Sequence, residues 1–146
     1  MADKLSLKVM PHSSETERCV LGCMLIDSET INIVKEVLSE DDFYDGEHKW
    51  VYKAIVSLAD RGKAVDTLTL SNELKENNVF DKIGGYEFLT KIGDSVISTN
   101  HVDDYCTIIK EKSIRRRLIR ELGSVIDQCY GDSIESFDII EAAQRA

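Results

Sequence analysis

The sequence lacks any long apolar segment. Its longest apolar run, from Cys19 to Ile26, is interrupted by Gly22, whereas a membrane-spanning helix needs about 20 apolar residues. The first ten residues also lack the apolar stretch and the cleavage site of a secretory signal peptide. These absences predict a cytoplasmic protein with no membrane partner.

Proline is scarce, and so is strict alternation of apolar and polar residues. Pro11 is the only proline in the 146 residues, and most apolar residues recur three or four positions apart. That spacing is typical of amphipathic helices, whereas half-buried strands alternate at every second residue. The sequence therefore predicts an all-α protein, with a small helical bundle followed by a projecting helical hairpin.

Motifs for nucleotide binding or catalysis are missing as well. A phosphate-binding loop requires an upstream glycine and a Gly-Lys-Ser/Thr triplet, but the only Gly-Lys pair, Gly62-Lys63, is followed by Ala64. His48 and His101 have no evident serine or cysteine nucleophile with an orienting carboxylate. We therefore expect no ATPase, no catalytic residue and no cofactor in this chain.

The cysteines suggest either a metal site or core packing. Cys19 and Cys23 are one helical turn apart and His12 precedes them, but structural zinc takes four ligands at recognisable spacings. Free cysteine behaves as a small apolar residue and stays reduced in the cytosol. We therefore expect no metal and four reduced, partly buried cysteines, namely Cys19, Cys23, Cys106 and Cys129.

The net charge of −9 argues against a general nucleic-acid-binding protein, because neutralisation of phosphates dominates such binding. The charge is uneven, since residues 110–120 contain six cations and only one anion, Glu111. This basic band suggests contact with an acidic partner or with acidic parts of the same chain. Contact with nucleic acid is the less favoured functional interpretation, given the overall charge. The alternative is a solvated helix face with local pairs such as Glu111 with Arg115.

Helical spacing and capping residues predict a globular bundle at residues 13–99. Ser14 with Glu17 has the pattern of a capping box, Ser39 with Asp42 suggests another cap, and Asp66 or Thr67 caps a later helix. Gly22 and Cys23 leave a strip of small residues where another helix can approach closely. The expected helices run from the Ser14 cap to about Ile26, and then over about 30–38, 47–61, 67–76 and 86–92.

Three aromatic residues, Phe43, Tyr44 and Trp50, fall within the bundle. They suggest either a binding platform or core packing, and we favour the core because aromatic side chains dominate small cores.

The pattern changes at residue 100, where a hairpin is expected to begin and to extend to residue 146. Residues 102–129 contain no proline and one glycine, which predicts a continuous helix of about 42 Å at 1.5 Å per residue. Gly131-Asp132 then breaks the helix, and a second helix is expected from about Ser133. We expect this second arm to be incomplete at residue 146 and residues 1–12 to form a flexible tail.

The first arm of the hairpin carries a broad apolar stripe that one partner arm cannot cover. Such exposed apolar surface usually marks an association site. We therefore predict self-association through Ile119, Leu122, Val125 and Ile126 of the first arm and Phe137 of the second.

Several short segments follow one another in a characteristic order. They are Pro11-His12-Ser13, Glu15-Thr16-Glu17, Val20-Leu21-Gly22, residues 40–44, His48, Asp60-Arg61-Gly62, residues 65–70, Gly84-Gly85, Phe88-Leu89, Asn100, Tyr105, Ile108-Ile109, Glu111-Lys112 and residues 116–119. No single segment is specific, but the ordered set resembles the N-terminal domain of DnaB-type bacterial replicative DNA helicases. The link at residues 94–99 departs from that family because it lacks a proline common there, and the resemblance weakens from Ser133 onward.

The resemblance implies domains that dimerise through their hairpins and build a ring of three dimers in a hexamer. In the family this collar binds the C-terminal domain of primase, which couples primer synthesis to unwinding. Candidate primase-binding residues are Glu15, Phe88, Arg116, Ile119 and Val125. Glu15 has a simpler alternative role, since an acidic residue favours a helix N-terminus.

The family's ATPase lies in a separate C-terminal RecA-like domain. ATP and Mg²⁺, contact with DNA and ATP-dependent 5′–3′ helicase activity are therefore expected only of a longer protein, and a helicase loader is a further candidate partner. Two other interpretations remain open. One is a free-standing adaptor or loader factor built on this domain, and the other is a small thiol- or metal-dependent enzyme.

Overall fold

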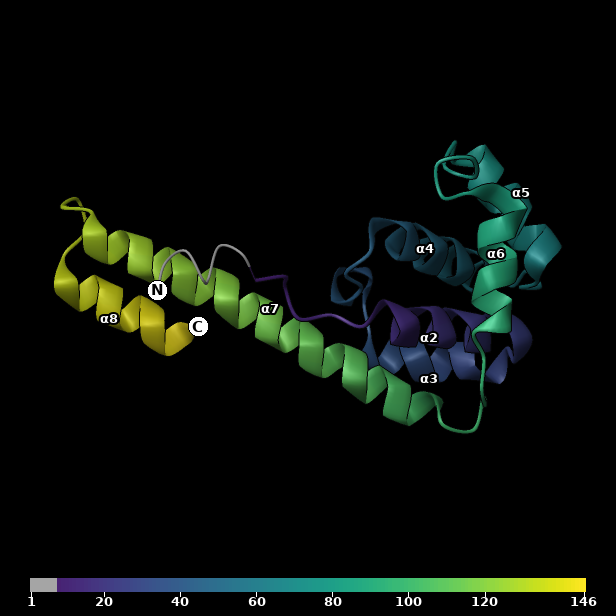
Figure 1. Ribbon diagram of the computed structural model, residues 1–146, viewed down its shortest axis with the longest axis horizontal. Helices are drawn as coiled ribbons and strands as arrows, with labels where there is room; N and C mark the ends of the chain where they lie inside the picture. Colours follow the sequence, from purple (N-terminus) through teal and green to yellow (C-terminus); the bar gives the residue numbers. More distant parts are fainter. Residues whose placement is uncertain (1–7) are drawn as a thin grey trace. The chain divides into compact units, whose positions relative to one another are not determined.

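The computed structural model describes residues 8–146, which contain seven α-helices and no β-strand. This confirms the all-α class. The expected tail at residues 1–12 lies mostly outside the described residues. The helices are α2 (Ser14–Ile26), α3 (Glu29–Val37), α4 (Gly46–Asp60), α5 (Thr67–Glu76), α6 (Gly85–Asp94), α7 (Val102–Tyr130) and α8 (Ser136–Arg145), with a 3-10 turn, η1 (Glu40–Asp42), before α4 (Figure 1).

The chain divides into two compact units. The bundle unit comprises residues 12–111, and the hairpin unit comprises residues 112–146 together with residues 8–11. The division falls inside α7, whereas the sequence suggested a boundary before this helix. The first turns of α7 belong to the bundle unit because Val102, Cys106 and Ile109 are buried in its core.

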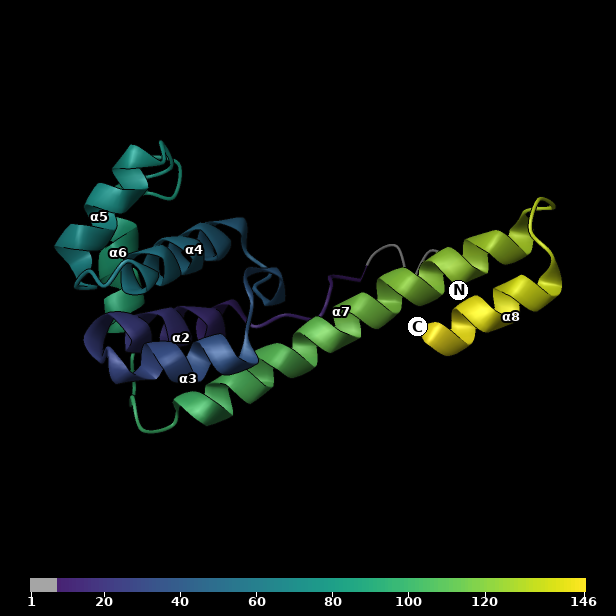
Figure 2. The ribbon, with the colours of Figure 1, turned by 180° about the vertical axis from the view of Figure 1, so that it is seen from behind.

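Helix α2 is the centre of the bundle unit, where it packs against α3, α4 and α6, while α5 packs against α4 and α6 (Figures 1 and 2). Val20, Leu21 and Met24 of α2 are completely buried. The strip of small residues on α2 has the expected consequence. A Cβ atom at Gly22 would lie 2.4 Å from Val96 Cγ2 and 2.6 Å from the carbonyl oxygen of Ile92, so only glycine allows this approach of α6.

The structure confirms two of the predicted caps and corrects one. Ser39 and Asp42 form a capping box, and the Asp66 side chain accepts a hydrogen bond from the Thr69 amide at 2.8 Å. At α2, however, the cap is Ser13, not Ser14, and Glu17 takes no part in it. The prediction was wrong at Glu17 because a capping box involves only residues close in sequence, whereas the Glu17 carboxylate is buried against another segment.

The aromatic residues of the bundle unit also require a correction. Phe43 is fully buried and its ring lies 4.9 Å from that of Tyr52. Tyr44 and Trp50, which were expected in the core, are 38% and 39% exposed. Core packing is therefore correct for Phe43 alone, because its two companions lie on the surface of the unit.

Three of the four cysteines are buried in the bundle unit, and the structure has all four as free thiols. Burial raises the pKa of both Cys23 and Cys106 to about 12, so these thiols remain protonated near neutral pH. Cys129, expected to be at least partly buried, is exposed. It lies near the end of α7, where the hairpin unit has little core to contain it.

The hairpin unit consists of the second part of α7, a turn and α8, which runs back alongside α7 (Figures 1 and 2). Helix α8 begins at Ser136, three residues after the expected Ser133. None of the helices within residues 8–146 has the length and apolar character needed to span a membrane.

Candidate interaction surfaces

The hairpin unit exposes an apolar face on α7. Ile119, Leu122 and Ile126 are 49%, 42% and 53% exposed. Residues spaced by three and four positions lie on one side of an α-helix, so the three side chains form a continuous stripe. The sequence selected these residues for self-association, and the structure places them together on the surface.

Helix α8 covers a neighbouring side of α7 and leaves this stripe open. The half-buried Val125 lines a hollow of about 260 Å³ together with Ala142 and Arg145 of α8. Val125 therefore faces the second arm of its own hairpin. On α8, Ile139 is buried, whereas Phe137 is 71% exposed.

Arg116, a candidate for primase binding, is engaged within the hairpin unit. Its guanidinium Nη1 donates a hydrogen bond of 2.8 Å to the carbonyl oxygen of Pro11, and the residue is only 4% exposed. The cation thus helps to hold the chain that precedes α2. Two other candidates, Ile119 and Val125, belong to the same unit.

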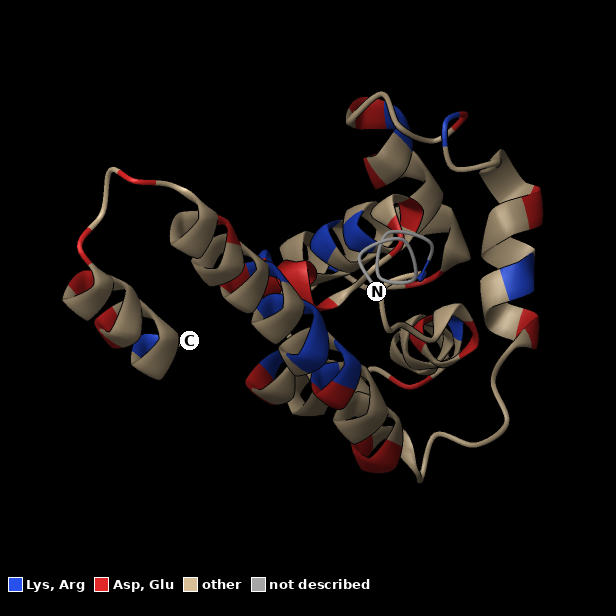
Figure 3. Ribbon diagram, turned by 60° about the vertical axis from the view of Figure 1, so that its left-hand side comes forward, with Lys and Arg blue, Asp and Glu red and all other residues tan. Residues whose placement is uncertain are grey.

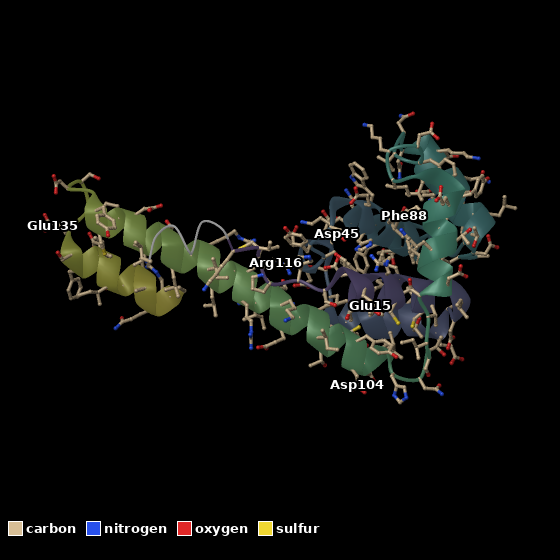
Figure 4. The ribbon with its side chains drawn as sticks, viewed as in Figure 1. Glu15, Asp45, Phe88, Asp104, Arg116 and Glu135 are labelled. Atoms are coloured by element: carbon tan, nitrogen blue, oxygen red, sulfur yellow. The ribbon has the colours of Figure 1, made fainter. Side chains whose placement is uncertain are left out.

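The remaining primase candidates, Glu15 and Phe88, belong to the bundle unit and are labelled in Figure 4 with Asp45. Glu15 is exposed in the first turn of α2. Phe88 is half-buried on α6, and its ring stacks on the imidazole of His48 with 5.9 Å between ring centroids. Glu15 is therefore open to a partner, whereas Phe88 presents only part of its ring.

A buried polar cluster lies behind Phe88, and sequence reasoning did not find it. Glu17 and His48 are each 1% exposed, and His48 Nδ1 lies 2.8 Å from Glu17 Oε1. The same carboxylate accepts hydrogen bonds from the backbone amides of Tyr44, at 2.8 Å, and Asp45, at 3.3 Å. The cluster fixes the loop before α4 against α2. Glu17 and His48 are 31 residues apart, so no local pattern reveals the pair.

These side chains are also a possible metal-binding group. Ligand atoms of Glu17, Asp45 and His48 all lie within 4.8 Å of one another, with Asp45 Oδ2 3.4 Å from His48 Nδ1. The Glu17 carboxylate already accepts two backbone amides and faces the imidazole. Such full hydrogen bonding is how buried charged groups are normally satisfied, and it accounts for the cluster without an ion.

Charge is segregated along the hairpin unit, as Figure 3 shows for α7 and α8. Residues 112–120 contain five cations and no anion, and residues 121–141 contain six anions and no cation. The bundle unit instead has 20 anions and ten cations. One of those cations, Lys110, lies 3.2 Å from Asp42 Oδ2, 68 residues earlier in the chain. The basic band predicted from the sequence therefore includes one ion pair with an acidic residue of the bundle unit.

Comparison with known proteins finds one family and full-length relatives. The sequence model of the DnaB-like helicase N-terminal domain matches residues 9–111. Replicative DNA helicase DnaC of Bacillus subtilis is 34% identical over 145 residues, which are 99% of this chain and 32% of that protein. Replicative DNA helicase DnaB of Geobacillus stearothermophilus is 33% identical over the same shares. The chain thus spans about a third of the length of these curated relatives.

Solved structures give a matching result. The N-terminal domain of DnaB helicase from Mycobacterium tuberculosis has a TM-score of 0.86 and 31% identity, with 93% of this chain and 96% of that chain covered. A DnaB-like replicative helicase, described with its interactions with primase, has a TM-score of 0.72 and 26% identity, with 90% of this chain and 31% of that one covered. The bundle and the hairpin therefore both have counterparts in a solved DnaB domain.

Proposed function

Because this chain belongs to the family of DnaB-like helicase N-terminal domains, we propose that it is the interaction domain of a replicative helicase. Its first role is self-association through the hairpin unit, which contributes to the collar of a hexamer. Its second role is recruitment of the C-terminal domain of primase to that collar. ATP, Mg²⁺, DNA contact and 5′–3′ unwinding belong to the longer protein.

The exposed stripe of the hairpin unit carries the proposal of self-association. Ile119, Leu122 and Ile126 remain 42–53% exposed although α8 already packs alongside α7. Complete burial of a large aliphatic side chain is worth about 1.5–3 kcal/mol. A second hairpin would gain part of that free energy at each position, and the gain would be shared by both copies. An apolar stripe of this kind favours a protein partner.

Primase recruitment is supported by the relatives and by the placement of the candidates. A helicase that is 26% identical is described with its interactions with primase. Glu15 and Phe88 offer a charged and an aromatic group on the bundle unit, while Ile119 and Val125 offer apolar groups on the hairpin unit. Aromatic anchors in partly buried positions are frequent hot spots of protein interfaces.

The test of self-association is sedimentation equilibrium of the 146-residue chain over a concentration series. We expect a reversible dimer that Leu122→Asp abolishes, because a carboxylate in the apolar stripe would be desolvated without a partner. The matched control is Leu68→Asp, since Leu68 is 65% exposed on α5 of the other unit. A wild-type chain that remains monomeric throughout, or equal effects of the two substitutions, would overturn this role.

The test of primase recruitment is isothermal titration with the C-terminal domain of primase. We expect saturable binding that Phe88→Ala and Ile119→Ala weaken, each by up to about tenfold if the side chain is a central anchor. Leu68→Ala is the control and should bind like the wild type. Absence of heat at high micromolar concentrations, with dimerisation intact, would leave self-association as the only role of this domain.

A second candidate function is a free-standing adaptor or loader factor built on the same domain. It is motivated by the family match, which concerns the N-terminal domain alone and covers residues 9–111. The gene sequence downstream of residue 146 discriminates the two. A Walker-type phosphate-binding segment supports the helicase, and a stop codon close to residue 146 supports the adaptor.

A further inference from the structure

We infer that His48 is a positioning residue for partner binding, because its fixed imidazole holds the ring of Phe88 in place before the partner arrives. The inference rests on the proposed recruitment of primase, in which Phe88 is a candidate anchor. It adds a buried residue that acts through Phe88 and not by a contact of its own. The residues involved all belong to the bundle unit, where Asp45 precedes α4 and Phe88 lies on α6 (Figure 4).

The orientation of the His48 ring is fixed by two carboxylates. Both oxygens of Glu17 accept backbone N–H groups, and a carboxylate offers only acceptors, so His48 Nδ1 donates its N–H to Glu17 Oε1 at 2.8 Å. Asp45 occupies the N-cap position of α4, but its side chain forms no cap hydrogen bond. Its Oδ2 lies instead 3.4 Å from the same nitrogen. Because the residue is also 99% buried, the imidazole has little freedom to turn.

The fixed imidazole lies against the ring of Phe88. The two rings are stacked, with 5.9 Å between their centroids and 30° between their planes, and interacting aromatic pairs have centroids about 4.5–7 Å apart. Phe88 is half-buried, so His48 covers part of its side chain and another part remains accessible. The Phe88 ring has no polar group that could fix its own position. Its placement therefore depends on the residue that it stacks on.

Stability alone does not account for a polar residue at this place. Replacement of a buried charged pair by apolar residues of similar volume is often neutral or stabilising. Elsewhere in the bundle unit one benzene-type ring packs on another, as Phe43 does on Tyr52 at 4.9 Å. A fully hydrogen-bonded network adds rigidity that apolar packing lacks. The imidazole held by Glu17 can therefore present its face to Phe88 in one orientation only.

A ring that is held in place before binding raises the affinity for a partner. Binding otherwise has to immobilise a side chain that takes several rotamers, and this loss of freedom weakens affinity by up to about tenfold. If His48 acts by holding the ring, its effect on affinity should disappear when Phe88 has no ring. An effect of His48 through the general stability of the bundle should persist in that background.

The experiment is a double-mutant cycle with the 146-residue chain, in which isothermal titration with the C-terminal domain of primase gives the dissociation constants. His48→Asn retains an N–H donor close to the position of Nδ1 and removes the rest of the ring. It should weaken binding at least about threefold when Phe88 is present. In the Phe88→Ala background it should change binding by less than about twofold.

The matched control is Tyr52→Phe. Tyr52 is also buried in α4, and the substitution removes its hydrogen bond of 2.6 Å to the Leu38 carbonyl oxygen. Its ring packs on Phe43. Urea unfolding should therefore show a loss of stability for Tyr52→Phe, while its affinity for primase should equal that of the wild type.

A second measurement needs no substitution in the core. In the unbound wild-type chain, NMR coupling constants to Cγ of Phe88 should report one χ1 rotamer, as for the fully buried Phe43. Phe137, which is 71% exposed, should average over several rotamers. His48→Asn should make Phe88 resemble Phe137. Several rotamers of Phe88 in the wild type would overturn the inference even if His48→Asn were too unstable to titrate.

Other results overturn the inference in distinguishable ways. Equal effects of His48→Asn with and without the Phe88 ring would mean that His48 acts through stability or by its own contact. If Phe88→Ala weakens binding and His48→Asn does not, Phe88 stands as an anchor without support from His48. If neither changes the affinity while Ile119→Ala does, primase recruitment stands and this part of the bundle lies outside the interface. A wild-type chain that does not bind primase refutes the proposed recruitment, and the inference with it.

Discussion

The bundle unit and the hairpin unit are both helical, but they differ in how much of their apolar surface they bury. Every residue of the main hydrophobic core lies between Cys19 and Ile109. In residues 112–146, Ile139 is the one buried hydrophobic residue, at 9% exposure. The bundle unit completes its core within one chain, whereas the hairpin unit leaves most of its large apolar side chains exposed.

Polar and charged side chains also differ between the two units in burial and pairing. In the bundle unit Glu17 and His48 are buried and paired, and no buried side-chain polar atom among the described residues lacks a hydrogen bond. In the hairpin unit Arg117, Asp127 and Asp132 are exposed and Lys112 is half-buried. None of the four forms an ion pair among the described residues. Mutations in the first unit should therefore change folding, and mutations in the second should change association.

The largest effect on folding is expected at Glu17. Replacement of Glu17 by alanine leaves the buried His48 and the Tyr44 amide without their acceptor. Loss of one partner of a buried pair costs about 3–5 kcal/mol. Urea unfolding followed by circular dichroism should show this loss, while Glu15→Ala, at an exposed position two residues earlier, should change stability by less than about 0.5 kcal/mol. Similar effects of the two substitutions would mean that the cluster does not stabilise the bundle.

A matched pair of leucines tests the comparison directly. Leu70 is fully buried in α5, and Leu122 is 42% exposed in α7. Leu70→Ala should lower the free energy of unfolding by about 2–5 kcal/mol, because it removes buried methyl groups and leaves a cavity. Leu122→Ala should change the unfolding of the monomer by less than about 0.5 kcal/mol but should raise the dimer dissociation constant. A large loss of monomer stability from Leu122→Ala would indicate that the hairpin has a core of its own.

A smaller effect on stability is expected when either of two helical glycines is replaced by alanine. Gly22→Ala introduces a Cβ atom against Val96 and the Ile92 carbonyl, at 2.4 and 2.6 Å, and such overpacking typically costs about 1–3 kcal/mol. Gly93→Ala, in α6, meets nothing within 4 Å and should stabilise the helix by about 0.5–1 kcal/mol. Thermal unfolding of the two variants should therefore shift in opposite directions. A shift in the same direction would show that α2 and α6 can separate without loss.

The features that could be predicted from the sequence depend on periodicity and local capping. Apolar spacing located the helices to within a few residues, and Ser39 with Asp42 formed the expected cap. These signals are local because backbone hydrogen bonds and caps join residues only three or four positions apart. The close approach of another helix to α2 at Gly22 could also be predicted, since only glycine leaves room for it.

The features that were missed depend on contacts between distant segments. Glu17 has the spacing of a capping residue, yet its carboxylate reaches a loop 27 residues away. Trp50 has the helical spacing of a core residue but lies on the surface. Apolar spacing shows which side of a helix faces the core, but it does not show how far around the helix the buried side extends. The candidate site is predicted only in part for the same reason. The stripe at Ile119 and Leu122 was evident, whereas the contact of Arg116 with Pro11 joins residues 105 positions apart.

The last prediction perturbs neither unit and uses the four free thiols as reporters. At pH 8, Cys23 and Cys106 remain protonated, because burial raises the pKa of each thiol to about 12 and the thiolate is the reactive form. They and the buried Cys19 should resist a thiol-specific reagent, while the exposed Cys129 reacts first.

Cys129 is seven residues from Leu122 and so shares its side of α7. Its labelling should slow as protein concentration rises if dimerisation covers that side, and Leu122→Asp should remove the concentration dependence. Rapid reaction of all four thiols in the native chain would contradict a closed bundle, and a rate independent of concentration would contradict a dimer that covers this end of α7.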